Sequence, residues 1–252
     1  MSPRIEWFGE FENCAMIILD RPEKRNAVDM ATLIELRQLL KEVQVRQVRV
    51  VVLAGAGPAF CSGADLDGVE LGEFTETLAS VLQDISDLPC LTVALIDGPA
   101  LGAGMQLAAA CDLRAATAGS SIGIPAVKLG LAVDLWTIER IGREAGWNVA
   151  RRILLTGEAL LAEDLAGQFV HRIMSKDRSL DECRQWCEQL SSLAPLSVRA
   201  HKLAIALASA GPGTERDEGL IENARLAAWA SSDAAEGRRA FLEKRAPRFT
   251  GH

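Results

Sequence analysis

The sequence predicts an α/β fold that continues into a helical C-terminal region. Two apolar runs, VRVVVLAG and CLTVALIDG, are bounded by glycine, as is typical of strands buried on both faces. Segments with apolar residues at three- and four-residue spacing alternate with these runs and indicate crossover helices. The alternation of strand, helix and strand predicts parallel strands with helices outside the sheet.

The N-terminal half supplies the predicted sheet. We expect strands over residues 5–8 and 15–20, joined by a turn at Phe11–Asn13. Asp29 fits the N-cap of a helix over residues 31–44, whose leucines share one face. A further strand, LRAATAG, is expected after a short helix.

The C-terminal half is predominantly helical by its apolar spacing. We expect helices over residues 147–157, 160–168, 179–194, 195–210, 214–231 and 232–245. Ser232 or Asp233 is available to cap the last one. Pro195 can open a helix but cannot continue one, so we place a boundary there. The prediction is a core domain over 1–195 and a helical region over 196–252.

Composition excludes several classes of protein. The 252 residues carry a net charge of −7, which argues against nucleic acid as a partner. The N-terminus lacks the pattern of a signal peptide, and no apolar run approaches the length of a membrane span. The six cysteines are scattered and the three histidines lie near no motif. We therefore expect reduced thiols, a cytoplasmic location, no membrane span and no metal site.

Two segments of small residues follow predicted strands and are candidates for ligand binding. In AFCSGADL, the backbone amide of Ala64 can point into a pocket, although an ordinary turn capped by Asp65 explains the same residues. In GPALGAGMQLA, Gly102 and Gly104 permit an unusual turn into a helix, whose first amides lack partners. Two such amides can hold a thioester oxygen as it gains negative charge.

The chain resembles the crotonase superfamily, also called the enoyl-CoA hydratase/isomerase family. The matching pieces run in family order from about Ile5 to Phe249, and they include LDRPEKRNAVD, VVLAGAGPAFCSGADL, ALIDGPALGAGMQLAAACDLRAA and IPAVKLGLAVD. The resemblance implies a spiral core of ββα turns with C-terminal helices that form trimers or hexamers. It also implies an acyl-CoA thioester as ligand, with coenzyme A belonging to the ligand and no separate cofactor.

The resemblance also implies site residues. It places the oxyanion amides on Ala64 and Ala103. The implied CoA contacts, largely through backbone, are Arg25, Ala27, Ser62, Ala64 and Leu66. Phe241 and Lys244 are implied to reach the CoA of a neighbouring subunit, whereas helix packing for Phe241 and a solvated position for Lys244 are the alternatives.

Two departures from the family pattern bear on catalysis. Hydratases of the family use two glutamates, and here those positions are Gln106 and Ala126. Gln can hydrogen-bond a water but cannot take its proton, and Ala offers no group at all. A positioned acid or base contributes about 10²–10⁴-fold, so the loss of both predicts very slow hydration.

Asp134 and Trp136 complete the predicted acyl pocket. Asp134 matches a carboxylate that serves as proton shuttle or nucleophile in other branches, but it also fits the N-cap of a helix beginning near Trp136. Trp136 either shapes the acyl pocket or packs in the core. GAGMQ, KLGLAVD and the tryptophan resemble an actinobacterial branch of acyl-CoA-binding proteins without hydratase chemistry.

Two hypotheses on function follow. The first is an acyl-CoA-binding protein of lipid metabolism with little or no hydratase activity. The second is an isomerase or related CoA-thioester enzyme that uses Asp134 as acid/base or nucleophile.

Overall fold

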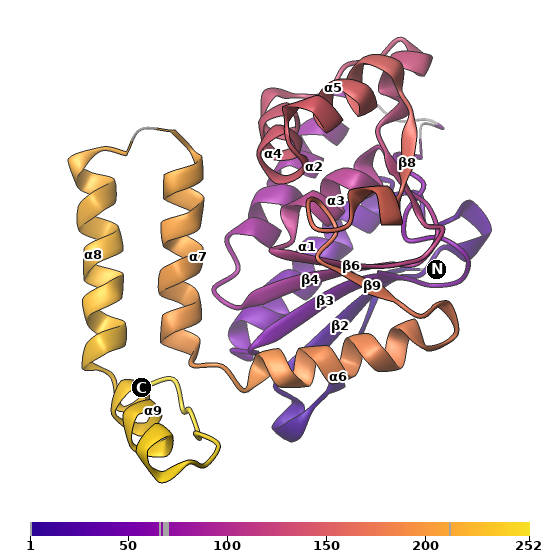
Figure 1. Ribbon diagram of the computed structural model, residues 1–252. Helices are drawn as coiled ribbons and strands as arrows, with labels where there is room; N and C mark the ends of the chain where they lie inside the picture. Colours follow the sequence, from indigo (N-terminus) through magenta and orange to yellow (C-terminus); the bar gives the residue numbers. More distant parts are fainter. Residues whose placement is uncertain (1, 66, 68–70, 212) are drawn as a thin grey trace. The chain divides into compact units, whose positions relative to one another are not determined.

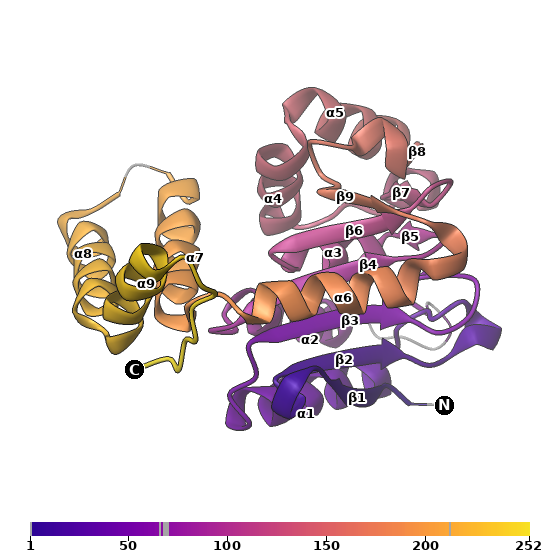
Figure 2. The ribbon, with the colours of Figure 1, turned by 60° about the horizontal axis from the view of Figure 1, so that its bottom comes forward.

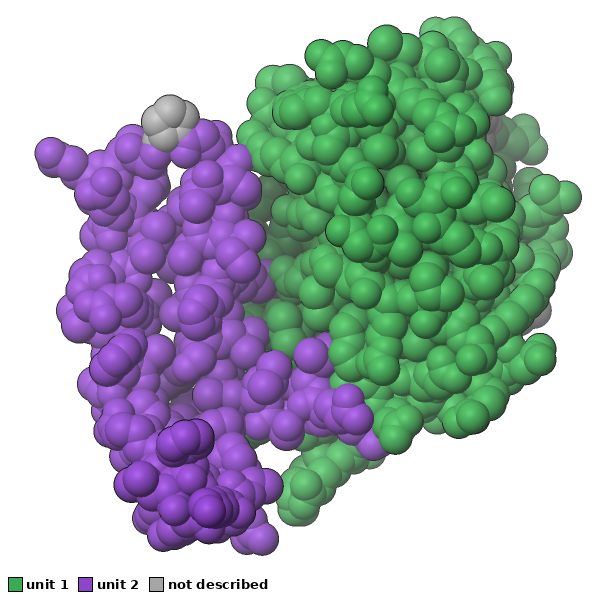
Figure 3. Space-filling view, viewed as in Figure 1, with its two compact units in different colours: residues 1–187 green, residues 188–252 purple. Residues whose placement is uncertain are grey.

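The computed structural model describes residues 2–65, 67, 71–211 and 213–252 (Figure 1). The chain forms two compact units, residues 1–187 and residues 188–252, which Figure 3 draws in different colours. The first unit carries the sheets and the second is helical, so the α/β class with C-terminal helices is confirmed.

A six-stranded sheet forms the centre of the first unit, in the order β1-β2-β3-β4-β6-β9. β1 is antiparallel to β2, and every other neighbouring pair is parallel, as the alternating pattern predicts. The register places Cys14 opposite Val50, and Val50 opposite Leu91. The strands are β1 Arg4–Phe8, β2 Cys14–Leu19, β3 Val50–Gly55, β4 Leu91–Ile96, β6 Leu113–Thr117 and β9 Arg172–Met174.

Helices cover both faces of this sheet. The helices α1 (Met30–Val45), α2 (Leu71–Ser86) and α3 (Ala103–Ala110) lie on one face, and α6 (Ser179–Ser191) crosses the other (Figures 1 and 2). The predicted cap of α1 is confirmed, because the Asp29 carboxylate accepts a hydrogen bond of 2.8 Å from the amide of Thr32.

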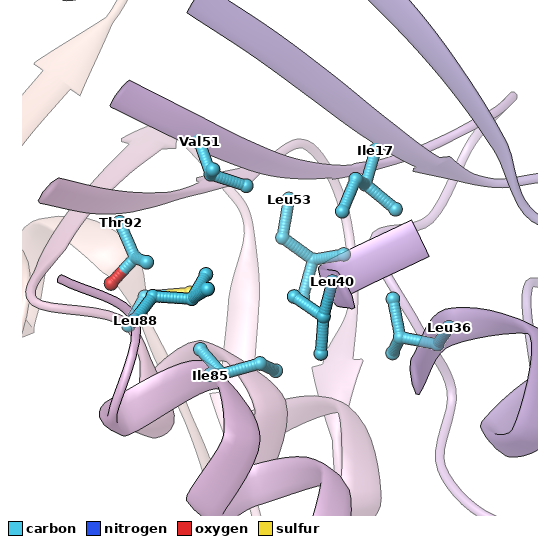
Figure 4. A pocket seen from close by; sticks show the side chains of 9 residues that line it. Ile17, Leu36, Leu40, Val51, Leu53, Ile85, Leu88 and Thr92 are labelled. Atoms are coloured by element: carbon cyan, nitrogen blue, oxygen red, sulfur yellow. The ribbon is translucent and has the colours of Figure 1, made fainter. Parts of the chain in front are cut away.

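The sheet and the helices α1 and α2 enclose a dry core. Figure 4 shows apolar side chains of β2, β3, α1 and α2 pointing toward one another. The void between them is about 10 Å³, which leaves no room for a ligand. They include Ile17, Leu36, Leu40, Val51, Leu53 and Ile85.

A smaller three-stranded sheet adjoins the two small-residue segments that are candidates for ligand binding. Its strands are β5 (Ala100–Leu101), β7 (Ser121–Gly123) and β8 (Ala159–Leu161), in the order β5-β7-β8. The helix predicted over 160–168 is wrong: the segment contains the end of β8 and a 3₁₀ turn, η4 (Ala162–Leu165). Leu160 and Leu161, the first residues of the predicted helix, instead pair with β7 as part of β8.

Between β6 and β9 the chain forms η3 (Pro125–Leu129), α4 (Leu135–Ala145) and α5 (Trp147–Thr156). Shorter 3₁₀ turns are η1 (Glu10–Glu12), η2 (Pro22–Lys24) and η5 (Lys176–Arg178). The turn predicted at Phe11–Asn13 thus overlaps η1, which joins β1 to β2.

The second unit contains α7 (Pro195–Ser209), α8 (Glu215–Ala230) and α9 (Ser232–Glu243). The predicted caps of α9 are wrong, because Ser231 accepts the capping hydrogen bond, 3.1 Å from the amide of Ala234. Asp233 is buried and instead accepts hydrogen bonds from the amides of Thr250 and Gly251, at 2.7 and 2.8 Å. These bonds anchor the C-terminal tail to α9.

Neither a membrane-spanning helix nor a metal site is found among the described residues. No helix described there combines the length and apolar character needed to cross a bilayer. The same residues contain no cluster of three His, Cys, Asp or Glu side chains that could hold a metal ion.

Arg114 is a fully buried cation that joins several elements, and the sequence motifs do not identify it. Its guanidinium donates to the carbonyl of Phe169 at 2.6 Å and to that of Cys111 at 2.8 Å. It also pairs with Glu144 of α4 at 2.5 Å. Arg140 pairs with the same Glu144 at 3.3 Å. The network joins β6, the end of α3 and α4.

Arg114→Met is expected to lower the free energy of unfolding by about 3–5 kcal/mol, because it leaves the buried carbonyl of Phe169 without its donor and removes one of the two cations that pair with Glu144. Urea unfolding followed by tryptophan fluorescence measures the loss. Arg143→Met is the matched control on α4, since the partly exposed Arg143–Glu139 pair contributes about 0–1 kcal/mol. Equal losses in the two variants would contradict a special role for Arg114.

Candidate functional site

Two loops of the first unit are joined through their backbones. The amide of Ser62 donates to the carbonyl of Arg25 at 3.0 Å, and the amide of Val28 donates to that of Gly63 at 2.9 Å. Val28 and Ala64 form a parallel bridge. The loops therefore bring together four of the predicted CoA contacts: Arg25, Ala27, Ser62 and Ala64. The fifth, Leu66, lies outside the described residues.

Asn26 holds the first of these loops in place. Both Arg25 and Asn26 have positive φ, at 51° and 57°, a conformation in which Asn is enriched. The buried Asn26 amide donates to the carbonyls of Ala56 and Ala59, at 2.8 and 2.7 Å, and its oxygen accepts from the amide of Arg21. No motif in the sequence marks this role, and the preference of Asn for such turns is the one signal that points to it.

Charged side chains add to the same junction. Arg21 pairs with Asp29 at 2.8 Å and with Asp65 at 3.0 Å, and Lys24 lies 3.5 Å from Asp65. The hydrogen bond from Arg21 keeps the pKa of Asp65 below its usual range. Arg21 is not among the site residues predicted from the sequence. The guanidinium of Arg25 is exposed on this loop.

The turn between β5 and α3 needs glycine. Gly102 caps α3 with φ 53° and ψ −120°, a combination that only glycine adopts readily. A Cβ on Gly104 would lie 2.2 Å from the carbonyl oxygen of Cys61. Cys61 is also hydrogen-bonded to the chain just before this turn. Its amide donates to the carbonyl of Pro99 at 3.0 Å, and its carbonyl accepts from the amide of Leu101 at 2.9 Å.

This packing brings two unpartnered amides into one region. Among the described residues, neither the amide of Ala64 nor that of Ala103 donates a hydrogen bond. Ala103 is the first residue of α3, where helical bonding cannot satisfy an amide and the helix dipole is positive. Gly63, next to Ala64, is so close to this turn that a Cβ on it would lie 3.9 Å from the amide nitrogen of Ala103.

The thiol of Cys61 lies in the same region but is unsuited to nucleophilic chemistry. Burial raises its pKa to about 12, so it is a neutral thiol near pH 7. Its Sγ donates a weak hydrogen bond to the carbonyl of Gly63 at 3.8 Å. Cys61 thus helps to pack the two segments.

Gln106 and Asp134 are connected through Thr137, which is not among the site residues predicted from the sequence. Nε2 of Gln106 lies 2.6 Å from Oγ1 of Thr137, and Thr137 Oγ1 lies 3.3 Å from Oδ2 of Asp134. Asp134 also accepts from the amide of Thr137 at 2.8 Å and so caps α4. The predicted capping role is confirmed, with the helix beginning at Leu135. A catalytic role for Asp134 stays a prediction.

The remaining predicted pocket residues pack against the core. Ala126 in η3 and Trp136 in α4 are partly buried against the apolar cluster of the first unit. Core packing therefore accounts for part of the Trp136 surface. Its contact with an acyl chain stays a prediction.

Phe241 and Lys244 lie in the second unit, on and just after α9. The ring of Phe241 is 84% exposed, and Lys244 is also exposed. Neither is therefore packed within its own unit. A groove of about 440 Å³ lies in the same unit, lined by residues of α7, α8 and α9 that include Ala200, Ala204 and Trp229.

Known proteins match nearly the whole chain. A family model described as "Enoyl-CoA hydratase/isomerase" matches residues 10–252. The chain belongs to the enoyl-CoA hydratase/isomerase family. A Mycobacterium bovis relative named "Probable enoyl-CoA hydratase echA6" is 36% identical over 244 residues, covering 93% of this chain and 95% of its own length. The Mycosarcoma maydis "Enoyl-CoA isomerase/hydratase fer4" is 37% identical over 261 residues, with 93% and 92% coverage.

Solved structures agree with this membership. The crystal structure of an enoyl-CoA hydratase from Bacillus anthracis superposes with a TM-score of 0.91 at 26% identity, covering 99% of each chain. This enoyl-CoA hydratase/isomerase family member therefore has the fold that the resemblance implies. The mycobacterial relative also fits the actinobacterial resemblance.

Gly104→Ala is expected to raise the Kd for an acyl-CoA at least tenfold, because the added methyl group meets the Cys61 carbonyl and displaces the start of α3. Isothermal titration calorimetry with a medium-chain acyl-CoA measures the change. Gly219→Ala is the control, since Gly219 in α8 has open space around its Cα and should tolerate a methyl group. Unchanged affinity in Gly104→Ala would show that this close approach is not needed.

Proposed function

We propose that the protein binds an acyl-CoA thioester in lipid metabolism and has little or no hydratase activity. The observation that carries the proposal is the pair of unpartnered amides, Ala64 and Ala103, beside a helix that presents Gln106 where a hydratase has glutamate. Family membership supports the ligand class.

The two amides form the proposed oxyanion hole for the thioester oxygen. Donors fixed in place before the ligand arrives stabilise a partial negative charge without reorganisation. The loops that carry Arg25, Ala27 and Ser62 provide the proposed contacts to CoA, and the exposed guanidinium of Arg25 suits its phosphates. Leu66 belongs to the same proposal on the resemblance alone.

Hydration requires a proton to be taken from water and another to be delivered to carbon. Gln106 has no titratable group, and its amide nitrogen is engaged by Thr137. Ala126 has no polar side chain. An oxyanion hole without a base binds and polarises the thioester but leaves the water unactivated.

Wild-type protein is expected to bind crotonyl-CoA without rapid hydration. Gln106→Glu alone should gain little, whereas Gln106→Glu with Ala126→Glu should raise the hydration rate at least about 10²-fold, since each acid–base group contributes about 10²–10⁴-fold. Loss of absorbance of the conjugated thioester measures turnover. Rapid hydration by the wild type, abolished by Gln106→Ala, would overturn the proposal.

We further propose a homotrimer or hexamer in which Phe241 and Lys244 contact CoA bound to a neighbouring subunit. The groove between small residues of α7 and the aromatic Trp229 supports such an assembly, because exposed apolar surface of this kind marks protein interfaces. The exposed ring of Phe241 lies outside this groove and is available to a neighbouring subunit's CoA. A cytoplasmic location belongs to the same proposal. It is supported by the six cysteines, all described, which form no disulfide.

Phe241→Ala with Lys244→Ala is expected to weaken CoA binding about tenfold without changing the assembly. Calorimetry measures affinity, and sedimentation should give three or six times 27.1 kDa for both proteins. Arg216→Ala removes another exposed cation of the same unit and serves as control. A monomer in solution, or unchanged affinity in the double variant, would contradict the shared site.

A further inference from the structure

A hydrogen-bonded chain of three side chains runs from α3 to the start of α4. Gln106 Nε2 lies 2.6 Å from Thr137 Oγ1, which lies 3.3 Å from Asp134 Oδ2. Gln106 is 6% exposed and Thr137 is 1% exposed, so the central contact is shielded from solvent. Such a chain has a direction, because each hydroxyl has one hydrogen to give.

The direction follows from the carboxylate end. An ionised carboxylate only accepts hydrogen bonds, so Thr137 must give its hydroxyl hydrogen to Asp134. Thr137 Oγ1 can then only accept from Gln106, which requires the amide nitrogen rather than the amide oxygen at that position. Asp134 therefore sets the orientation of the Gln106 amide through Thr137.

This orientation leaves Oε1 of Gln106 as an acceptor. Among the described residues, Oε1 has no hydrogen-bond partner, and it keeps contact with solvent although more than nine-tenths of the residue is buried. Gln106 lies one turn of α3 beyond Ala103 and on the same face, since residues three apart are neighbours on a helix. An acceptor so placed lies within a few bonds of a thioester carbonyl held at Ala103.

We infer that Thr137 and Asp134 are positioning residues that make Gln106 select an acyl-CoA with a hydroxyl group on carbon 3. The inference rests on the proposed acyl-CoA binding. An acceptor without a partner in the protein favours a ligand that supplies a donor, and saturated or enoyl chains supply none. Gln106 accepts a hydrogen bond from the hydroxyl group but cannot remove a proton, so the ligand is bound and not dehydrated.

Calorimetry with CoA thioesters of one chain length tests the inference. Wild-type protein should bind the 3-hydroxyacyl-CoA about 3- to 10-fold more tightly than the saturated acyl-CoA, the range of one neutral hydrogen bond. Thr137→Val should bring this ratio to about one, because it releases the Gln106 amide. Thr137→Ser keeps the hydroxyl and should keep the ratio. Since the readout is a ratio within each variant, a general loss of affinity does not affect it.

Asp134→Asn gives a second, independent readout. The Asn oxygen can still accept from the amide of Thr137, which leaves an NH₂ group where Oδ2 was. That group donates to Thr137, which then donates to Gln106 and turns its NH₂ group toward the ligand. The preference should move from the 3-hydroxyacyl-CoA to the 3-oxoacyl-CoA, whose carbon 3 carries only an acceptor.

The outcomes separate the two proposals. Tight binding of all thioesters with equal affinity for hydroxy and saturated chains overturns this inference and leaves acyl-CoA binding intact. A ratio that survives Thr137→Val, or an unchanged preference in Asp134→Asn, overturns the positioning roles. Failure of the wild type to bind any acyl-CoA overturns the proposed function itself.

Discussion

The buried guanidinium of Arg114 is the interaction on which the geometry of the candidate site depends. It gives hydrogen bonds to the carbonyls of Cys111 and Phe169 and pairs with Glu144 of α4. The end of α3 and the body of α4 are thereby fixed to β6. The amide of Ala103 belongs to α3 and Thr137 belongs to α4, so the contact between Gln106 and Thr137 relies on this cation. A buried charge is stable there because each nitrogen of the guanidinium donates to a carbonyl or carboxylate.

At the N-terminal end of α3, the geometry of the site depends on the close approach of the helix backbone to the Cys61 segment. Gly104 lets the helix approach the Cys61 carbonyl, and Asn26 fixes the loop that pairs with the Ser62–Asp65 segment. The positions of the two unpartnered amides, Ala64 and Ala103, are thus set by contacts that other residues make. Rigid backbone donors suit recognition of a thioester oxygen, whatever acid–base chemistry follows. Backbone donors of this kind do not require a glutamate side chain.

The local sequence pattern correctly predicted features that depend on a single strand or helix. Apolar runs bounded by glycine identified β3 and β4, and Asp29 caps α1 as expected. Asp134 caps α4, which is one of the two roles that the sequence left open for it. The local pattern failed where a tertiary partner competes. Residues 160–168 have helical spacing, yet pairing with β7 converts their start to a strand. Ser231 rather than Ser232 or Asp233 caps α9, because Asp233 is engaged by the C-terminal tail.

The sequence by itself determined the α/β class, the family, the two small-residue segments, and the presence of Gln106 and Ala126 at the positions where the resemblance implies glutamates. These follow from residue identity and local order. Only the tertiary structure decided which groups meet: Arg114 with Glu144, Arg21 with Asp65, and Gln106 with Thr137. These partners are far apart in the chain, and no local periodicity encodes a contact between them. The direction of the Gln106 amide is a property of that contact, since it is set by a carboxylate two hydrogen bonds away.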